Sequence, residues 1–259
     1  GERLVDRAIA TAGIVAGLKL DPASIRGALL AVLPAAKAFD AADVASRFGD
    51  DVSGLVAGVA RMDSIRARRV GATQEERAAQ SENLRKMLLA MVEDIRVVIL
   101  KLAERLAALR WLMSGDESLR RESAREVLDL YAPLANRLGV WQLKWELEDL
   151  SFRAIEPETY KQIAKLIDER RLDRQRYIED VIETLKRELA SSRIAADVTG
   201  RPKHIFSIWT KMRRKQSGIE TLYDIRAVRI LVDDVKDCYT ALGIVHHLWT
   251  PLQHEFDDY

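Results

Sequence analysis

The chain has 259 residues, of which 48% are hydrophobic and 31% charged, and its formal net charge is +1. This length allows one large domain or two ordinary ones, and the apolar fraction excludes a wholly disordered chain. The near-neutral charge balance excludes a uniformly basic nucleic-acid binder, so any affinity for phosphate must be local. A single cysteine, Cys238, excludes an internal disulfide and a cysteine-rich zinc site. Because we find no signal peptide and no apolar run of membrane-spanning length, we expect a soluble cytoplasmic protein.

The segment from Leu4 to about Ser192 is rich in alanine, leucine, arginine and glutamate, which favour helices. Helix starts are predicted at Asp21-Pro22, at Asp40 and at Asp94, where an aspartate can accept hydrogen bonds from the first N–H groups. A further helix is expected to restart at Glu156-Pro157. The apolar residues predicted to form the buried face of the helix after Asp94 are Val97, Val98, Leu100, Leu102, Leu106 and Leu109.

Three other features of this helical part have a predicted role. Trp141 and Trp145 are one turn apart, so we expect them to share a helix face and to pack in the core rather than stack on a ligand. The polar segment from Gly71 to Gln80 is the candidate for a mobile loop. The charged segment from Tyr160 to Ser192 predicts one or two helices that connect two domains.

The stretch from Gly200 to Lys215 combines many cations with an apolar helical face. Its cations are Arg201, Lys203, Lys211, Arg213, Arg214 and Lys215, and its apolar residues are Ile205, Phe206, Ile208, Trp209 and Met212. Pro202 suits the first turn of the helix. Free N–H groups at a helix start, several cations and the hydroxyl of Ser207 suit a polyanion. A solvated basic helix face explains this stretch equally well.

Two strands are predicted around this basic helix, one at Ile194 to Val198 and a second, buried one at Ala227 to Val232. Asp233-Asp234 is expected to cap a helix that runs from Val235 to about Trp249. This alternation of strands and helices predicts an α/β arrangement. Asp224 precedes the second strand, where its carboxylate is either a salt-bridge partner or a ligand for Mg²⁺, which binds carboxylates together with substrate phosphates.

Three sequence blocks, in this order, resemble the synthetase domain of the RelA/SpoT family of stringent-response enzymes. They read G-R-P-K-H-x-x-S-I-x-x-K-M from Gly200, Y-D-I-R-A-V-R-I-L-V from Tyr223 and D-C-Y-x-A-L-G-I-V-H-x-L-W from Asp237. Upstream blocks resemble the N-terminal hydrolase-type domain of the same family, and they read S-E-N-L-R-K-M from Ser81, P-L-A-N-R-L-G from Pro133 and K-W-E-L-E-D-L from Lys144. The resemblance therefore covers nearly the whole chain.

The resemblance implies a mainly α chain with three parts. The first, residues 1–155, would be an all-helical HD-type domain, and residues 156–192 would form a helical connector. Residues 193–259 would begin an α/β, nucleotidyltransferase-like synthetase domain. Because the family's Gly-Tyr-x-Ser-Leu-His block does not follow, we expect a truncated synthetase domain or further residues beyond Tyr259.

The family's hydrolase uses a metal site of histidine and aspartate, but the first 203 residues of this chain contain no histidine. The family's His-Asp-x-x-Glu-Asp corresponds to the six residues from Ala31 to Ala36, and its Ala-Asp-Arg-Leu-His-Asn corresponds to Ala103 to Ala108. The family's upstream histidine corresponds to Arg7. We therefore predict a pseudo-hydrolase domain that keeps the fold without the metal site. Whether this domain binds a regulatory nucleotide stays open.

The acidic run Glu255-Phe256-Asp257-Asp258 resembles the Glu-x-Asp-Asp of monofunctional, RelA-type synthetases rather than the Arg-x-Lys-Asp of bifunctional members. This agrees with the lost hydrolase site. The implied activity is stringent-response alarmone synthesis by an ATP:GTP 3′-diphosphotransferase. Such an enzyme transfers pyrophosphate from ATP to the 3′-hydroxyl of GDP or GTP and forms (p)ppGpp.

The resemblance also implies roles for individual side chains. Arg201 would contact the ATP base or phosphates, and Asp224 would ligate Mg²⁺. The residues that would hold the ATP phosphates are Lys203, Ser207 and Lys211. The further nucleotide-binding candidates are Arg229, which would support the site from its strand, Tyr259, which would approach the acceptor's phosphates, Lys215 and His246. For His246, packing among apolar residues of its helix is an equally good explanation.

ATP, GDP or GTP, and Mg²⁺ are therefore the expected ligands, and ribosomes with uncharged tRNA are expected partners of the full-length protein. The first alternative is a catalytically silent, nucleotide-binding or regulatory fragment. The second is an RNA- or ribosome-binding piece that uses Lys211 to Lys215 on the phosphate backbone, and such binding should weaken steeply as salt rises. The sequence leaves open a homo-oligomer and the choice between GDP and GTP.

Overall fold

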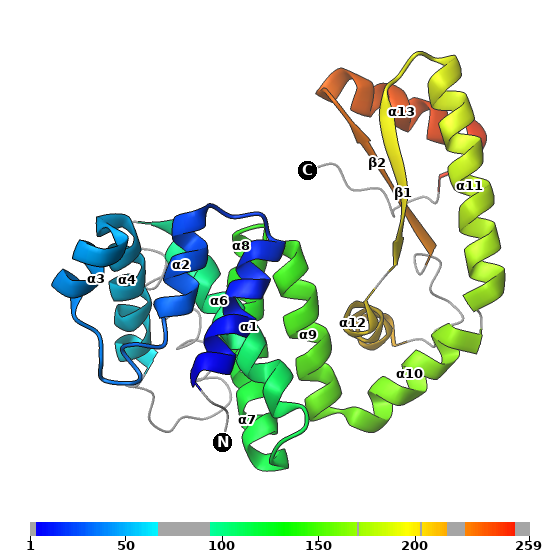
Figure 1. The fold of residues 1–259 in the computed structure, drawn as a ribbon. Coiled ribbons are helices and arrows are strands. Elements are labelled where there is room, and N and C mark those ends of the chain that lie inside the picture. Colours follow the sequence, from blue (N-terminus) through cyan, green and yellow to red (C-terminus); the bar gives the residue numbers. More distant parts are fainter. Residues whose placement is uncertain (1–3, 67–93, 170, 203, 217–225, 252–259) are drawn as a thin grey trace. The chain divides into compact units, whose positions relative to one another are not determined.

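The structure is a computed structural model that describes residues 4–66, 94–169, 171–202, 204–216 and 226–251. The chain divides into two compact units, Gly1–Pro157 and Glu158–Tyr259. In the described part of the chain, the first unit consists of helices, whereas the second combines helices with a pair of strands (Figure 1). The prediction of a mainly α chain is confirmed. The predicted three-part division at residues 155 and 192 stays a prediction.

The first unit begins its helices where aspartates can cap them. Its elements are α1 (Leu4–Gly17), α2 (Pro22–Leu30), α3 (Ala41–Phe48), α4 (Asp50–Arg66), α6 (Ile95–Leu112), α7 (Glu117–Glu126), a π-helical turn η1 (Val127–Tyr131), α8 (Ala132–Arg137) and α9 (Trp141–Ile155). The carboxylates of Asp21, Asp40 and Asp94 accept backbone N–H groups of the first turns of α2, α3 and α6 at 2.8–3.0 Å. All three predicted helix starts are therefore confirmed.

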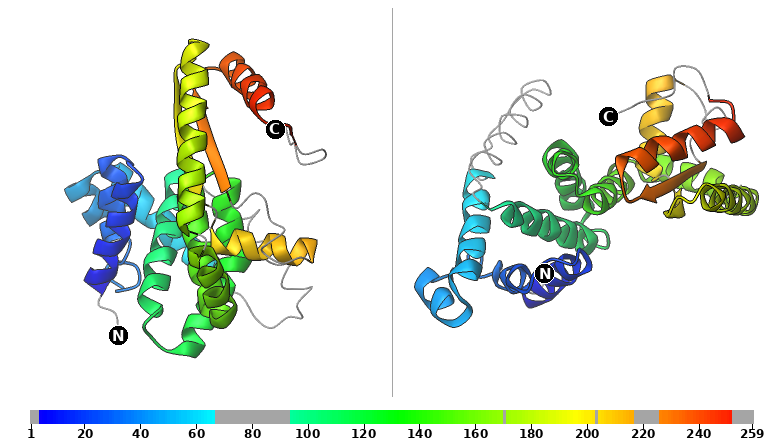
Figure 2. Two further views of the ribbon diagram at one scale, coloured as in Figure 1. Left: turned by 90° about the vertical axis from the view of Figure 1, so that its right-hand side faces the viewer. Right: turned by 90° about the horizontal axis from the view of Figure 1, so that it is seen from above.

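Helix α6 lies at the centre of the first unit and contacts α1, α2, α4, α7 and α9 (Figures 1 and 2). All six residues of its predicted apolar face are buried, and none is more than 4% exposed. Gly58 of α4 lies where that helix meets α6, and a Cβ at this position would be 2.6 Å from Cγ2 of Val97. A glycine is therefore needed for the close approach of α4 and α6.

The prediction that Trp141 packs in the core is wrong, because its side chain is 46% exposed. Its ring lies 6.4 Å from that of Trp145, so the two tryptophans do share one face of α9. Lys144 Nζ lies 5.7 Å from the centre of the Trp141 ring. Helical spacing placed the two rings together, but it could not show that the first turn of α9 leaves Trp141 open to solvent.

The second unit contains α10 (Pro157–Glu169, which begins at the boundary), α11 (Arg171–Ser191), β1 (Ala196–Pro202), α12 (Ile205–Lys215), β2 (Arg226–Val232) and α13 (Val235–Leu248). The two strands are antiparallel, with a register that runs from Ala196 opposite Val232 to Pro202 opposite Arg226. Helix α11 runs alongside the strands, and α11 and α13 contact each other as well as the sheet (Figure 2). The predicted order of strand, helix, strand and helix is confirmed.

A small core joins α11, the strands and α13. Its buried members are Leu185, Leu189, Ile194, Val198 and Ala241. Val228, Ile230 and Val232 of β2 pack against this core, whereas Leu231 is 55% exposed and Arg229 is also exposed. The prediction of a fully buried second strand is therefore wrong, because among the described elements helices cover only one face of the sheet.

The end of β1 differs from its prediction. The strand extends to Pro202, which pairs with Arg226, so the prediction that Pro202 lies in the first turn of the basic helix is wrong. A proline is tolerated at a strand end because it lacks only a ladder donor. Helix α12 instead begins at Ile205, after His204 in extended backbone. The predicted loop from Gly71 to Gln80 lies outside the described residues.

Candidate functional site

The basic helix α12 has two different faces. On its apolar side Ile208 is fully buried, and the rings of Phe206 and Trp209 lie 5.6 Å apart. Ser207 and Lys211 are one turn apart on the other side, and both are half-buried. The apolar side therefore anchors the helix while a hydroxyl and an ammonium group share its polar side.

Another cation of α12 contacts its own helix. The guanidinium of Arg213 lies 5.0 Å from the centre of the Trp209 ring, which is within the range of a cation–π contact. The cations of α12 are thus divided between its two sides. Arg213 provides a natural comparison for Lys211, because both charges belong to the same helix.

The start of α12 follows directly after the end of β1. The N-cap residue His204 makes no side-chain hydrogen bond to the first turn among the described residues, although its carbonyl accepts the N–H of Ile208 at 3.1 Å. The first-turn N–H groups form the positive end of the helix dipole. Such a helix start, next to a strand end that carries Arg201, is suited to a phosphate group.

The structure places some of the nine predicted site residues and not others. Ser207 and Lys211 lie on α12, Arg201 lies in β1 opposite Ala227, and Arg229 lies in β2 opposite Thr199. Lys215 ends α12, and the side chains of Arg201 and Lys215 are outside the described part of the molecule. Lys203, Asp224 and Tyr259 lie outside the described residues altogether.

His246 lies on α13 and its side chain is exposed. The interpretation of His246 as a histidine packed among apolar residues is therefore wrong. The residues of α13 that do pack against the sheet core include Ala241, Ile244 and Val245. His246 follows them on a different side of the helix, which the sequence spacing alone left undecided.

The structure also bears on metal and membrane binding. Among the described residues, no group of three or more histidine, cysteine, aspartate or glutamate side chains is placed to hold a metal ion. None of the helices in the described ranges is both long and apolar enough to cross a membrane.

Glu104 and Arg105, two of the residues at the hydrolase-type positions, form an ion pair with each other. Glu104 of α6 accepts a hydrogen bond from Lys101 Nζ at 2.5 Å with one carboxylate oxygen and from Arg105 at 3.2 Å with the other. Burial raises the pKa of Glu104, but the charges of Lys101, Arg105 and Arg7 outweigh it and lower the pKa to about 2. Ala31 follows α2 and has no ligand atom in its side chain. These residues do not fit the metal that an HD-type site would hold.

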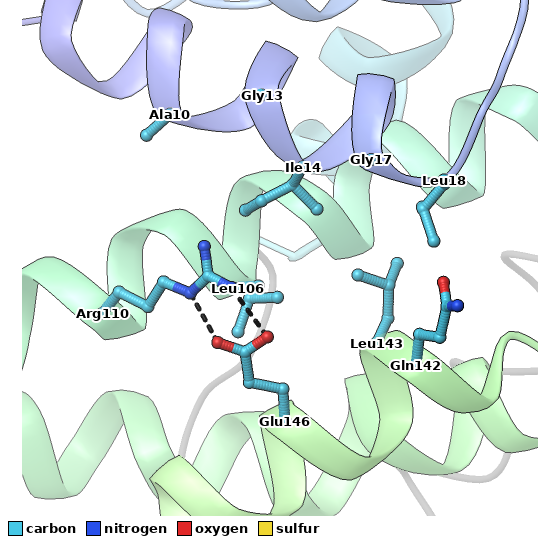
Figure 3. A pocket seen from close by; sticks show the side chains of 10 residues that line it. All are labelled: Ala10, Gly13, Ile14, Gly17, Leu18, Leu106, Arg110, Gln142, Leu143 and Glu146. Carbon is cyan, nitrogen blue, oxygen red and sulfur yellow. Dashed lines mark hydrogen bonds and ion pairs between the residues drawn. The ribbon is translucent and has the colours of Figure 1, made fainter. Parts of the chain in front are cut away.

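A groove that the sequence did not predict lies in the first unit between α1, α6 and α9, with a volume of about 350 Å³. Figure 3 shows Arg110 and Glu146 facing each other across it, joined by two hydrogen bonds of 2.6 and 2.7 Å. Ala10, Gly13 and Gly17 of α1 line the groove together with the larger Ile14 of the same helix and Leu18 just after it. The spacing of the three small residues is the sequence signal that could have indicated it. The groove contains none of the nine predicted residues.

The chain matches two family models, one in each unit. Residues 1–141 match the HD domain, and residues 200–259 match the region found in RelA / SpoT proteins. The HD match covers more than half of the chain and agrees with the helical first unit. The second match begins in β1 and covers the basic helix and the second strand.

Curated relatives match nearly the whole chain. The GTP pyrophosphokinase of Escherichia coli strain K12 is 46% identical over 256 residues, which are 99% of this chain and 34% of that protein. The GTP pyrophosphokinase of Haemophilus influenzae strain Rd is 47% identical over 93% of this chain and 32% of its own length. That of Streptomyces coelicolor is 39% identical over 100% of this chain and 30% of its own length. The chain thus spans about a third of these relatives. The chain belongs to the HD domain family, and its residues 200–259 are similar to the region found in RelA / SpoT proteins.

Proposed function

We propose that the protein containing this chain is a (p)ppGpp synthetase. It transfers pyrophosphate from ATP to the 3′-hydroxyl of GDP or GTP: the new bond joins the 3′-oxygen to the β-phosphorus, and AMP leaves. The observation that carries the proposal is the 39–47% identity to proteins named GTP pyrophosphokinase, together with the RelA / SpoT region over residues 200–259.

Helix α12 and the end of β1 hold the ATP phosphates in this proposal. Pyrophosphoryl transfer places negative charge on phosphate oxygens, so catalysis depends on positioning and charge neutralisation. The side-by-side position of Ser207 and Lys211 on α12 supports this role, as does the helix start beside Arg201. Lys203 is assigned to these phosphate-binding residues by the resemblance alone.

The proposal includes Mg²⁺, held by Asp224 and by the phosphates of the substrate. Magnesium commonly binds through one or two carboxylates together with phosphate oxygens, so a larger cluster of protein ligands is not required. The further nucleotide contacts proposed are Arg229, Lys215, His246 and Tyr259. Of these, Arg229 has support from its exposed position in β2, opposite Thr199 and close to the strand end that carries Arg201.

Several finer points rest on the resemblance. They are a monofunctional, RelA-type enzyme without hydrolase activity, a cytoplasmic location, and ribosomes with uncharged tRNA as activating partners of the full-length protein. The aliphatic residues at the hydrolase positions support the first point. The acidic run from Glu255 to Asp258 supports it independently.

The proposal is tested by replacing matched cations of α12 in the full-length protein. Lys211→Met should lower the rate of (p)ppGpp formation by about 10–150-fold, since a charge-assisted phosphate contact contributes about 1.5–3 kcal/mol. Arg213→Met should change the rate by less than about 3-fold, because Arg213 lies over Trp209 of its own helix. Equal losses in both variants would contradict the role of α12. ATP binding without product, even with ribosomes and uncharged tRNA, would instead favour the silent regulatory fragment.

A further inference from the structure

The first unit buries a group of charged side chains in its core. Lys101 of α6 is 1% exposed, and the side chains of Glu104 and Arg105 are 9% and 13% exposed. Lys101 Nζ donates hydrogen bonds to Glu104 and to Asp63 of α4. Burying charges is costly unless each finds an opposite charge, so such a group must be internally balanced.

The charges around Glu104 are balanced by residues from several helices. Lys101 and Arg105 each contact one of its carboxylate oxygens, and Arg7 of α1 acts on it through its charge. Arg105 in turn interacts with the charges of Glu126 and Asp63. Three cations therefore face three carboxylates, and the group joins α1, α4, α6 and α7.

By the sequence resemblance, two members of this group, Glu104 and Arg7, correspond to ligand positions of the HD-type metal site. Glu104 stands where the family pattern has an aspartate, and Arg7 stands where it has a histidine. The other two metal-ligand positions are the aliphatic Ala31 and Val32. Of these four positions, Glu104 alone keeps a side chain of a type that binds metal ions. Both oxygens of its carboxylate already accept hydrogen bonds from cations.

We propose that internal cations replace the metal ion in this unit. Arg7, Lys101 and Arg105 supply the positive charge that balances Glu104, and the first unit keeps its HD-type fold without binding a divalent cation. This inference does not depend on the proposed synthetase function, because all of its residues lie in the first unit.

Counting bound Mn²⁺ tests the proposal directly. The full protein and Glu104→Gln should bind the same number of Mn²⁺ equivalents by electron paramagnetic resonance, since Glu104 is not a ligand. Any ion held in the second unit is common to both proteins and cancels in the comparison. Loss of one equivalent in Glu104→Gln would overturn the proposal.

Stability measurements test the ion pairs themselves. Glu104→Gln and Lys101→Met should each lower the thermal unfolding midpoint by about 5 °C or more, because each removes one charge from a buried, balanced group. The double variant should lower it by less than the sum. Glu146→Gln is the matched control, since Glu146 pairs with Arg110 at the surface, and its shift should stay below about 2 °C. Additive losses, or losses no larger than the control's, would overturn the proposal.

A third measurement does not require that any Glu104 variant folds. Asp224→Asn removes the proposed magnesium ligand of the second unit and leaves the first unit unchanged. Its unfolding midpoint should be the same in Mn²⁺ as in a chelator. A midpoint raised by Mn²⁺ in this variant, and equally raised in the wild type, would show a metal site elsewhere and overturn the proposal.

Discussion

Arg96 of α6 and Asp51 of α4 form an ion pair with two hydrogen bonds, Nη2 to Oδ1 at 2.5 Å and Nη1 to Oδ2 at 3.1 Å. The same guanidinium bonds Asp94, the N-cap of α6, at 2.6 Å and Asp21, the N-cap of α2, at 3.3 Å. Each aspartate complements the dipole of its own helix, but the three would repel one another without a cation between them. Arg96 therefore ties the starts of α2, α4 and α6 together.

Replacing Arg96 should loosen the first unit. Arg96→Met is expected to lower the free energy of unfolding by about 1–3 kcal/mol, which is less than a fully buried pair would cost because the Arg96 side chain is 26% exposed. The control is Arg47→Met, since the Arg47–Asp43 pair is 68% and 51% exposed and should contribute about 0.5 kcal/mol or less. Urea unfolding followed by circular dichroism measures both. Equal losses would contradict the role given to Arg96.

Asp21 should make the stability of the chain depend on acid pH. Hydrogen bonds from the hydroxyl and N–H of Ser24, and then the charge of Arg96, lower the pKa of Asp21 to about 2. An unfolded aspartate titrates near pH 4, so ionised Asp21 stabilises the fold above about pH 4, and this contribution disappears as the pH falls towards about 2.

The variant Asp21→Asn isolates this charge, because asparagine keeps an oxygen that can cap α2. The difference in unfolding free energy between wild type and Asp21→Asn should be constant above about pH 5 and should shrink between about pH 4 and 2. Chemical denaturation across this range measures it. A difference that stays constant down to about pH 2 would show that the Asp21 carboxylate is not perturbed.

These contacts show which parts of the fold the sequence could predict. The caps at Asp21, Asp40 and Asp94 were predictable because a cap depends on residues two or three positions away. The partners of Arg96 were not, since Asp51 and Asp21 are 45 and 75 positions from it. Local rules identify helix starts, whereas the packing of those starts against each other is set by tertiary structure.

In the candidate site, too, local features could be predicted and non-local ones could not. The common face of Ser207 and Lys211 follows from helical spacing and could be predicted. Pro202 was misassigned because the pairing of β1 with β2 is non-local and extends the strand to that residue. Similarly, the ion pair of Lys101 with Asp63 of α4 joins residues 38 positions apart, which no periodicity reveals.

Gly58 should be the sensitive glycine of α4. Gly58→Ala places a methyl group 2.6 Å from Cγ2 of Val97 and is expected to lower the free energy of unfolding by about 1–3 kcal/mol. Gly54, one turn away on the same helix, has no atom within 4 Å of an added Cβ, so Gly54→Ala should be neutral or stabilise by up to about 1 kcal/mol. Chemical denaturation of both variants decides the matter, and similar effects would contradict the close approach of α4 and α6.

Gly200 should be equally intolerant in the second unit. A Cβ there would lie 2.9 Å from Cγ2 of Ile178 on α11, so Gly200→Ala is expected to lower the thermal midpoint by about 3 °C or more. Gly243→Ala on α13 serves as the control, because nothing lies within 4 Å of its added Cβ. Ile178→Ala removes the contacting Cγ2, so it should lower the midpoint less in the Gly200→Ala protein than in the wild type. Equal losses in the two backgrounds would contradict the contact with α11 as the cause.

Synthesis of (p)ppGpp by the full-length protein is the decisive measurement for the proposed function. The full-length protein with ATP, GTP and Mg²⁺, with ribosomes and uncharged tRNA added, should form (p)ppGpp. The Asp224→Asn variant should form it at about one hundredth of the wild-type rate or below. Asp233→Asn, which changes an exposed aspartate just after β2, should stay within about 2-fold of wild type. Absence of product from the wild type, or an Asp224→Asn variant as active as the wild type, would contradict the account.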